Sequence, residues 1–587
     1  MLKTLIKEVK QYKRDSLCAP FFIALEVIME ILIPLVTASI IDNGIEAGNL
    51  NHVYQYGFIM ILLASLSLTF GALAGTFAAR ASAGFAKNLR ESMYQNIQRY
   101  AFSNIDKYST AGLVTRMTTD VTNVQNAYQM ILRMCVRSPL MLICAVISCF
   151  SINAELSLVF VVAIVFLGGA LTIIVLSAMK IFNYVFKKYD AVNASVQENI
   201  SAIRVVKAYV REDFENDKFT NAANNLYKLF VKAENILAFN SPVMLVAVYG
   251  SILGLSWFGA KHITYGNMST GDLTAMFSYV MSIMMSLMML SMIFVMVTMS
   301  VASGKRIAEV LNEEPDITNP EHPITEIKDG SIDFNHVNFA YDKDYTEKDT
   351  LQDIDIHIRS GETIGIIGGT GSGKSSLVNL ISRLYDVKSG EVLVGGKDVR
   401  AYDLEELRNQ VSVVLQKNVL FSGTILDNLR WGNEHASEEE CIHACKLACA
   451  DEFVERFPDK YNTYIEQGGT NVSGGQTQRL CIARALLKKP KILILDDSTS
   501  AVDTATDAKI RHAFATEIPN TTKLIIAQRI SSVQDADRIL VLDNGTISGF
   551  DTHDNLLKNN PIYQEVYESQ IKGGGDFDKQ EGIGGEQ

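Results

Sequence analysis

At 587 residues the chain is too long for one ordinary domain and suits two or three. Its net charge of −12, without a basic patch, argues against nucleic acid as a partner. The mean hydropathy of +0.13 averages over two different halves, because long apolar runs recur between residues 17 and 300 and then stop. These features favour a membrane-embedded first half and a soluble second half.

The first 16 residues combine basic and apolar side chains and lack the features of a secretory signal. Lys3 and Lys7 alternate with apolar positions such as Leu5 and Val9. This pattern predicts an amphipathic helix over residues 1–16 that lies on the inner membrane surface. A flexible basic leader is the alternative interpretation.

Six apolar runs are long enough to span a bilayer, which takes ~20 residues. Lys and Arg gather in the long connections 80–134 and 179–239, whereas the short connections 42–54 and 154–155 contain none. The long connections and both termini of this multi-pass cell-membrane protein are therefore predicted to be cytoplasmic. The predicted spans cover residues 17–41, 55–79, 135–153, 156–178, 240–260 and 273–299.

The two long connections are predicted to form pairs of helices. Residues 80–134 continue the second span, turn near Ser109–Gly112 and lead into the third span, and residues 179–239 repeat the pattern around Ile203–Glu215. Helices rise 1.5 Å per residue, so such arms would project well below the membrane. The soluble half is the candidate to receive them. We place the transmembrane domain at 17–304 and a linker at 305–330.

Two features inside the spans could contact a substrate. Glu26 and Glu30 lie one turn apart in the first span, and ionisable groups at membrane depth indicate function. The alternatives are pairing with another span or a position near the cytoplasmic rim.

The last predicted span carries a stripe of methionines at helical spacing. Methionine suits a cavity that accepts varied apolar ligands, although helix packing or lipid contact would explain the stripe equally well. The candidate substrate contacts in it are Met285 and Met292. The stripe consists of Met281, Met285, Met288, Met292, Met296 and Met299.

Cys441, Cys445 and Cys449 follow one another at four-residue spacing and share one helix face. Closed zinc sites use tight cysteine pairs and a fourth ligand, so we expect these thiols to pack in a core. The expected compartment of the soluble half is reducing.

A buried-strand pattern at Thr363–Ile367 is followed by the string G-x-x-x-x-G-K-S and a helical stretch. The backbone N–H groups of such a loop close on phosphate oxygens, Lys374 would reach the β and γ phosphates, and Ser375 would bind Mg²⁺. ATP and Mg²⁺ are therefore the predicted cofactors. The loop residues are Gly368, Gly369, Thr370, Gly371, Ser372, Gly373, Lys374, Ser375 and Ser376.

A second apolar strand, Lys491–Leu495, ends in Asp496 and Asp497. A strand that delivers a carboxylate beside a phosphate loop holds the magnesium and its water shell in folds of this kind. We assign this role to Asp496.

The segment Val472–Gln476 resembles the LSGGQ signature of the ABC transporter family, with Val in place of the leading Leu. Further matches follow in the family's order. Tyr341 matches the aromatic residue that stacks on adenine, Gln416 matches the glutamine that senses Mg²⁺ and the membrane arms, and Ser500–Asp503 matches the D-loop. Six spans followed by one such domain is the layout of an exporter-type half-transporter.

The resemblance implies a six-span α-helical membrane domain joined to an α/β P-loop nucleotide-binding domain of the ABC type at 331–572, with a helical subdomain. It also implies that two such domains close head to tail around two ATP molecules. Each site then combines the phosphate loop of one chain with the signature of the other, so a dimer is required. The signature residues are Ser473, Gly474, Gly475 and Gln476, and the D-loop contributes Asp503.

Two departures from the family pattern concern the hydrolytic step. Asp497 stands where the family has a glutamate that polarises water, and Gln528 stands where it has a switch histidine. The aspartate is one methylene shorter, and a glutamine amide is neither a cation nor a proton shuttle. Together they predict a site that binds ATP but hydrolyses it slowly or not at all. Glu466–Gly469, before the signature, also departs from the usual Gly-Glu-Arg-Gly.

Because the signature is nearly intact, the chain resembles the degenerate-site subunit of heterodimeric bacterial multidrug-type exporters. The expected partner is a second half-transporter that carries the Glu and the His, and the expected substrate is a small apolar or cationic compound, with lipids and peptides left open. The alternatives are a non-hydrolysing regulatory subunit, an exporter-fold importer and a homodimer with two slow sites. The Gly-rich tail at 573–587 is predicted to be disordered.

Overall fold

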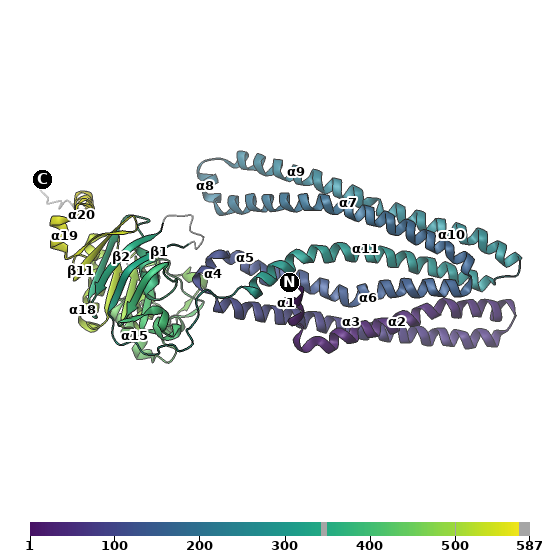
Figure 1. Ribbon diagram of the computed structural model, residues 1–587, viewed down its shortest axis with the longest axis horizontal. Helices are drawn as coiled ribbons and strands as arrows, with labels where there is room; N and C mark the ends of the chain where they lie inside the picture. The colour runs from purple at the N-terminus through teal and green to yellow at the C-terminus, as the bar shows by residue number, and fades with distance from the viewer. Residues whose placement is uncertain (342–348, 499–500, 575–587) are drawn as a thin grey trace, which may run out of the picture. The chain divides into compact units, whose positions relative to one another are not determined.

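The computed structural model describes residues 1–341, 349–498 and 501–574. These residues form two compact units, one of helices and one built around β-sheets (Figure 1). The helical unit contains residues 1–99 and 108–313, and the second unit contains residues 100–107 and the chain from 314 onward. The predicted tail lies outside the described residues, apart from its first two positions.

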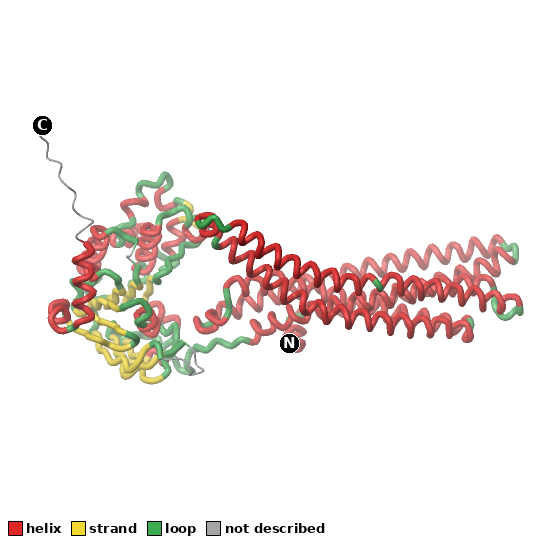
Figure 2. Tube along the Cα trace, turned by 90° about the horizontal axis from the view of Figure 1, so that it is seen from above, coloured by secondary structure: helices red, strands yellow, loops and turns green. Residues whose placement is uncertain are grey.

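Long helices make up the first unit and run side by side (Figures 1 and 2). Six stretches of the described chain are long and apolar enough to cross a membrane, and each contains one predicted span. The six-span prediction is therefore confirmed. The helices of this unit are α1 (Leu2–Lys7), α2 (Lys13–Ser39), α3 (Leu50–Arg99), α5 (Thr110–Thr115), α6 (Val121–Ile152), α7 (Ala154–Ser201), α8 (Ile203–Ala208), α9 (Glu212–Ala238), α10 (Asn240–Thr264) and α11 (Thr270–Asn312).

The second arm has the predicted form, since α7 and α9 are joined by the short helix α8. The first arm differs. After α3 ends at Arg99, the chain forms the short helix α4 (Phe102–Lys107), which belongs to the second unit. Ser109 does not open the predicted turn but caps α5, since its hydroxyl accepts a hydrogen bond from the Gly112 N–H at 3.0 Å.

The amino terminus packs onto the first unit. Leu5 and Val9 are buried, and the side-chain amide of Asn88 on α3 donates to the Glu8 carbonyl at 2.8 Å. The predicted single helix over residues 1–16 is interrupted after Lys7, and α2 begins at Lys13. At the other end, α11 continues to Asn312, beyond the boundary that we placed at residue 304.

An ion pair ties α11 to the start of α6. The Arg306 guanidinium donates to both carboxylate oxygens of Asp120, at 2.7 and 2.5 Å, and Asp120 is only 1% exposed. A carboxylate buried to this extent is stable only with such a partner. The pair therefore fixes the carboxyl-terminal part of α11 against the first arm.

The second unit contains three sheets. Their strand orders are β2-β1-β4-β5, β12-β11-β3-β10-β9-β6 and β7-β8, and the central strands of the largest sheet are parallel. The strands are β1 (Ile332–Phe339), β2 (Leu351–Ile358), β3 (Thr363–Gly368), β4 (Ser389–Val394), β5 (Lys397–Asp398), β6 (Val411–Val414), β7 (Gly423–Thr424), β8 (Tyr464–Ile465), β9 (Ile492–Asp496), β10 (Thr522–Ile526), β11 (Arg538–Asp543) and β12 (Thr546–Asp551).

Helices cover the large sheet and form a separate helical group between β6 and β9. Parallel strands alternating with helices are the expected α/β arrangement for a phosphate-loop domain. Besides α4, the helices are α12 (Lys374–Ile381), α13 (Leu404–Gln410), α14 (Ile425–Arg430), α15 (Glu438–Leu447), α16 (Asp451–Val454), α17 (Gly474–Leu486), α18 (Thr504–Glu517), α19 (His553–Asn559) and α20 (Pro561–Gly574).

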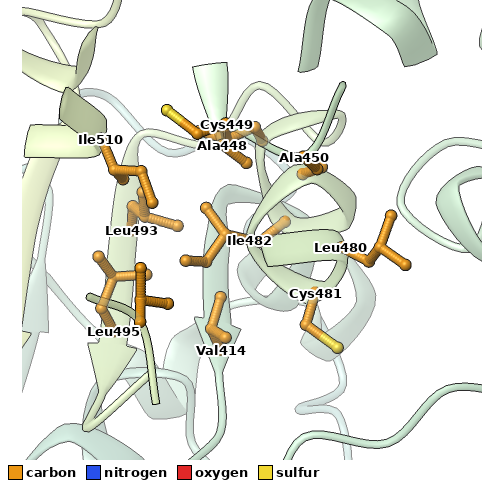
Figure 3. Packing of buried hydrophobic residues seen from close by; sticks show 14 of the residues in the cluster. Val414, Ala448, Cys449, Ala450, Leu480, Cys481, Ile482, Leu493, Leu495 and Ile510 are labelled. Carbon is orange, nitrogen blue, oxygen red and sulfur yellow. The ribbon is translucent and has the colours of Figure 1, made fainter. Parts of the chain in front are cut away.

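One hydrophobic core joins the helical group to the sheet. Figure 3 shows Ile482 of α17 beside Val414 of β6 and Leu493 of β9. Cys441, Cys445 and Cys449 are buried in the same core, where burial raises the pKa of each thiol. The prediction that these cysteines pack in a core is therefore confirmed.

We expect Arg306→Met to lower the free energy of unfolding by about 2 kcal/mol, because it leaves the buried Asp120 carboxylate without its guanidinium partner. The cost is below that of a fully buried pair because Arg306 is partly exposed. Thermal unfolding of the full chain in detergent measures the effect. Lys305→Met, an exposed position on the same helix, is the control, and equal unfolding midpoints for the two variants would contradict the assignment.

Candidate functional site

Four predicted site segments follow four neighbouring parallel strands. The phosphate loop follows β3, Gln528 follows β10, Asp496 ends β9 and Gln416 follows β6. Because the carboxyl ends of parallel strands meet at one edge of a sheet, these segments lie along the same edge. The candidate site is therefore built by the strand order, from segments that are far apart in the chain.

The phosphate loop depends on two glycines with left-handed backbone. Gly371 has φ +81° and Gly373 has φ +96°, a region that residues with a Cβ rarely adopt. A Cβ at Gly368 would collide with the Leu542 carbonyl of β11, whereas the space beside Gly369 and Gly371 is open. The loop can therefore wrap its backbone around an anion at the start of α12.

Lys374 lies over the loop. Its ammonium group donates to the carbonyls of Gly368 at 2.8 Å and Gly369 at 2.7 Å. Burial lowers the pKa of Lys374, and the nearby carboxylates of Asp496 and Asp497 act in the opposite direction. A cation held in this way beside an open backbone loop is suited to phosphate groups.

The Ser375 hydroxyl and the Asp496 carboxylate lie together. Burial raises the pKa of Asp496, and its interaction with the Ser375 hydroxyl acts in the opposite direction. Hydroxyl and carboxylate oxygens are ligands that Mg²⁺ prefers, so this pair fits the predicted metal site. Gln416 lies in an exposed segment after β6, and no hydrogen bond among the described residues joins it to this pair.

The two departures from the family pattern are in direct contact. The Gln528 side-chain amide donates to the Asp497 carboxylate at 2.7 Å. Asp497 has φ +47°, its N–H donates to the Ile526 carbonyl at 3.1 Å, and its side chain is only 9% exposed. The carboxylate is therefore held at the sheet edge by a neutral donor.

Tyr341 is half exposed and belongs to an aromatic cluster. Its hydroxyl hydrogen-bonds with Ser376 at 2.8 Å, and its ring centroid lies 5.0 Å from that of Tyr385. Tyr385 in turn donates to Asp106 of α4 at 2.5 Å, and burial together with this contact raises its pKa. Sequence reasoning missed Tyr385, because an isolated tyrosine after a helix carries no motif.

The signature residues form the start of α17. Ser473 caps the helix and forms a capping box with Gln476. A Cβ on Gly475 would come within 2.7 Å of the Ala501 carbonyl, and the Ala501 N–H donates to Gln478 at 3.1 Å. In the described part of the chain, no hydrogen bond joins Ser473–Gln476 to the phosphate loop of the same chain.

The predicted D-loop is described only in part. Ser500 lies outside the described residues, while Ala501 packs against the signature glycines. Asp503 caps α18 by accepting a hydrogen bond from the Thr506 N–H at 2.9 Å. The structure thus shows the Asp503 side chain in a local capping role.

A groove of about 410 Å³ in the second unit was also missed from sequence. Phe421 and Trp431 stack there with ring centroids 4.0 Å apart, Arg484 lies over Phe421, and Phe102 of α4 is at its border. Its residues come from β6, α4, α13, α17 and the loops on either side of α14, so no single stretch of sequence could indicate it.

The candidate substrate residues of the first span are paired with another span. Arg137 of α6 forms ion pairs with Glu26 and with Glu30, whose carboxylate oxygens lie 2.7 and 2.8 Å from its second guanidinium nitrogen. This is the pairing alternative stated above. Two carboxylates sharing one guanidinium leave the triad with one excess negative charge.

The two candidate substrate contacts in the methionine stripe of α11 are exposed. Met285 and Met292 are 57% and 59% exposed within the single chain, whereas the neighbouring Met284 is buried in the helical core. The side chain of Met299 lies outside the described residues.

Comparisons with known proteins agree with this architecture. Residues 16–288 match the family model for the ABC transporter transmembrane region, and residues 351–500 match the ABC transporter model. An uncharacterized ABC transporter ATP-binding protein of Bacillus subtilis, YfiB, is 38% identical over 96% of this chain and 97% of its own length. Rv1273c of Mycobacterium tuberculosis, similarly named, is 34% identical over 97% of this chain and 98% of its own.

A similar fold occurs in the solved structure of a bacterial Atm1-family ABC exporter with ATP bound. The TM-score is 0.81, at 23% sequence identity, over 95% of this chain and 98% of that one. At this identity the likeness establishes the fold alone.

The raised pKa of Asp496 predicts a pH-dependent stability. Above the raised pKa the buried carboxylate is charged at a cost, and below the unfolded pKa it is protonated in both states, so the cost disappears. Asp496→Asn should therefore unfold at a higher temperature than the wild type near pH 8, and the difference should shrink as the pH falls through the raised pKa. Differential scanning fluorimetry of nucleotide-free protein measures this, and a difference independent of pH would contradict it.

Proposed function

This chain belongs to the ABC transporter family, and from that premise we propose that it is one subunit of a heterodimeric exporter. Its transmembrane region is of the exporter type and is fused to an ATP-binding domain, so ATP-coupled transport is its general activity. In our proposal its own nucleotide site is slow or inactive in hydrolysis, and its signature completes the active site of a partner subunit.

The hydrogen bond from Gln528 to Asp497 is the observation that carries this proposal. A general base needs its carboxylate within reach of the attacking water, and the aspartate is shorter than the usual glutamate. Here the neutral side-chain amide of Gln528 donates a hydrogen bond to the Asp497 carboxylate. It supplies no positive charge on the side of the γ-phosphate. The phosphate loop, Lys374 and the Ser375–Asp496 pair nevertheless keep the features needed to bind ATP with Mg²⁺.

The geometry of the signature supports the second half of the proposal. Ser473 and its two glycines form the start of α17, and a helix start is a suitable contact for a phosphate. Gly475 leaves room for the D-loop carbonyl at Ala501, so the signature and the D-loop form one surface. We propose that this surface closes on the phosphate loop of the partner subunit. That partner carries the Glu and the His at the hydrolytic positions.

Transport then depends on the arms. The two nucleotide-binding domains close around ATP, and the closure moves the arms so that the spans open outward. On α8, Val205 is 56% exposed and the adjoining Tyr209 and Val210 are more so, which suits the entry of such a helix into an apolar groove. We propose that the groove beside Phe421 and Trp431 receives the equivalent arm of the partner subunit.

The substrate is proposed to be a small apolar or cationic compound. The excess negative charge of the triad formed by Glu26, Glu30 and Arg137 favours a cation over an anion. Met285 and Met292 offer an exposed, adaptable apolar surface on another span.

Purification of this chain alone and together with the product of its genomic neighbour tests the dimer. We expect negligible ATP turnover from the single chain and rapid turnover from the pair, because only the pair has a complete hydrolytic site. ATPase assays and particle mass in detergent provide the readout. A stable homodimer that hydrolyses ATP briskly would overturn the heterodimer proposal.

The Asp497→Glu, Gln528→His double variant tests the slow site. A correctly placed general base contributes ~10²-fold or more in rate, so hydrolysis at this site should rise by about that factor. Single-turnover hydrolysis should be followed in a complex whose partner has an inactivated nucleotide site. Asp551→Glu, the same side-chain change on β12, is the control. Unchanged turnover would favour the regulatory-subunit alternative.

A further inference from the structure

Gln570, near the end of α20, binds the chain on both sides of Arg529. Its side-chain amide donates to the Gln528 carbonyl at 2.8 Å, and its side-chain carbonyl accepts from the Ile530 N–H at 2.9 Å. One glutamine side chain thus satisfies two backbone groups in the segment that follows β10. None of the sequence motifs pointed to this residue.

This contact fixes the backbone from which the Gln528 side chain extends to Asp497. Residue 528 is held at its carbonyl by Gln570 and through its side chain by the Asp497 carboxylate, at 2.7 Å. Ile530 is buried and begins a short helical turn, so its N–H has no access to bulk water. Without Gln570 the segment would lose both backbone hydrogen bonds and the defined direction of Gln528.

The helix that carries Gln570 is itself firmly attached to the sheet. Tyr563 at its start is fully buried and hydrogen-bonds with His553 of α19 at 2.7 Å. Asn560, before the helix, accepts from the Tyr563 N–H at 2.9 Å and donates to the Ser548 carbonyl of β12 at 3.0 Å. Helix α20 therefore connects the edge strand β12 to the segment after β10.

We propose that Gln570 is a positioning residue of the nucleotide site, through which α20 holds Gln528 in place. The inference rests on the proposed function, in which Gln528 stands on the γ-phosphate side of bound ATP. Gln570 itself contacts only the backbone of residues 528 and 530. A loss of its hydrogen bonds should therefore weaken the response of the site to the γ-phosphate and leave the rest of the nucleotide contacts intact.

Gln570→Met tests this, because methionine has a similar length and forms neither hydrogen bond. Gln564→Met is the matched control, since Gln564 lies on the same helix but donates to the Leu557 carbonyl of α19. Affinities of the full-length chain for ATP and for ADP are measured by displacement of trinitrophenyl-ATP. We expect Gln570→Met to lower the ATP affinity about fivefold, as for the loss of one or two hydrogen bonds, with the ADP affinity unchanged.

Hydrogen exchange at Ile530 provides a second readout. Gln570→Glu keeps an acceptor for the Ile530 N–H but loses the donor to the Gln528 carbonyl. The Ile530 N–H should therefore stay protected from exchange in Gln570→Glu and exchange faster in Gln570→Met. Equal losses of ATP and ADP affinity, or affinities equal to those of Gln564→Met, would overturn this inference alone. A wild-type chain that binds ATP and ADP equally would overturn both the role of Gln528 and this inference.

Discussion

The parallel pairing of β10 with both β3 and β9 is the constraint on which the nucleotide site depends. Ile526 is paired with Ile366 on one side and with Asp496 on the other. This register places the end of β3, the Asp496 carboxylate and the segment that follows β10 at one level of the sheet. A slip by one residue would turn Asp496 away from Ser375, because successive side chains point to opposite faces.

Charged groups of both signs meet at this sheet edge. Asp496 and Asp497 are both buried, and Lys374 supplies the opposing charge from the loop. A cation at position 528 would add a second positive charge to that of Lys374, whereas the glutamine there adds only a hydrogen-bond donor. In the proposed slow site, a neutral donor and a shorter acid, joined by a hydrogen bond, stand in place of the family's histidine and glutamate.

The helical unit handles its charges in the same way, by pairing them across helices. Asp120 is neutralised by Arg306 between α6 and α11, and Glu26 and Glu30 share Arg137 between α2 and α6. The pair formed by Asp120 and Arg306 contains one charge of each sign and so has no excess charge. The second has one carboxylate more than it has cations, because Glu26 and Glu30 share the single guanidinium of Arg137.

Sequence patterns alone predicted the six spans, the helical second arm, the glycine-rich loop after β3, the acidic end of β9 and the capped start of α17. Each of these is encoded by a local pattern: apolar runs of bilayer length, or glycines and polar residues at fixed spacing beside a strand or a helix. The predicted turn in the first arm was less exact, as at Ser109, because caps and tertiary contacts decide where a helix begins and ends.

Only the tertiary structure decided which of these residues meet. Gln528 and Asp497 are separated by a helix and a strand, yet they share a hydrogen bond because β9 and β10 are adjacent. Packing likewise brings distant positions together where Arg137 forms ion pairs with Glu26 and Glu30. The same holds where Gln570 donates a hydrogen bond to the Gln528 carbonyl in the segment after β10. A hydrogen bond or an ion pair depends on distance and direction in space, and separation along the chain does not specify either.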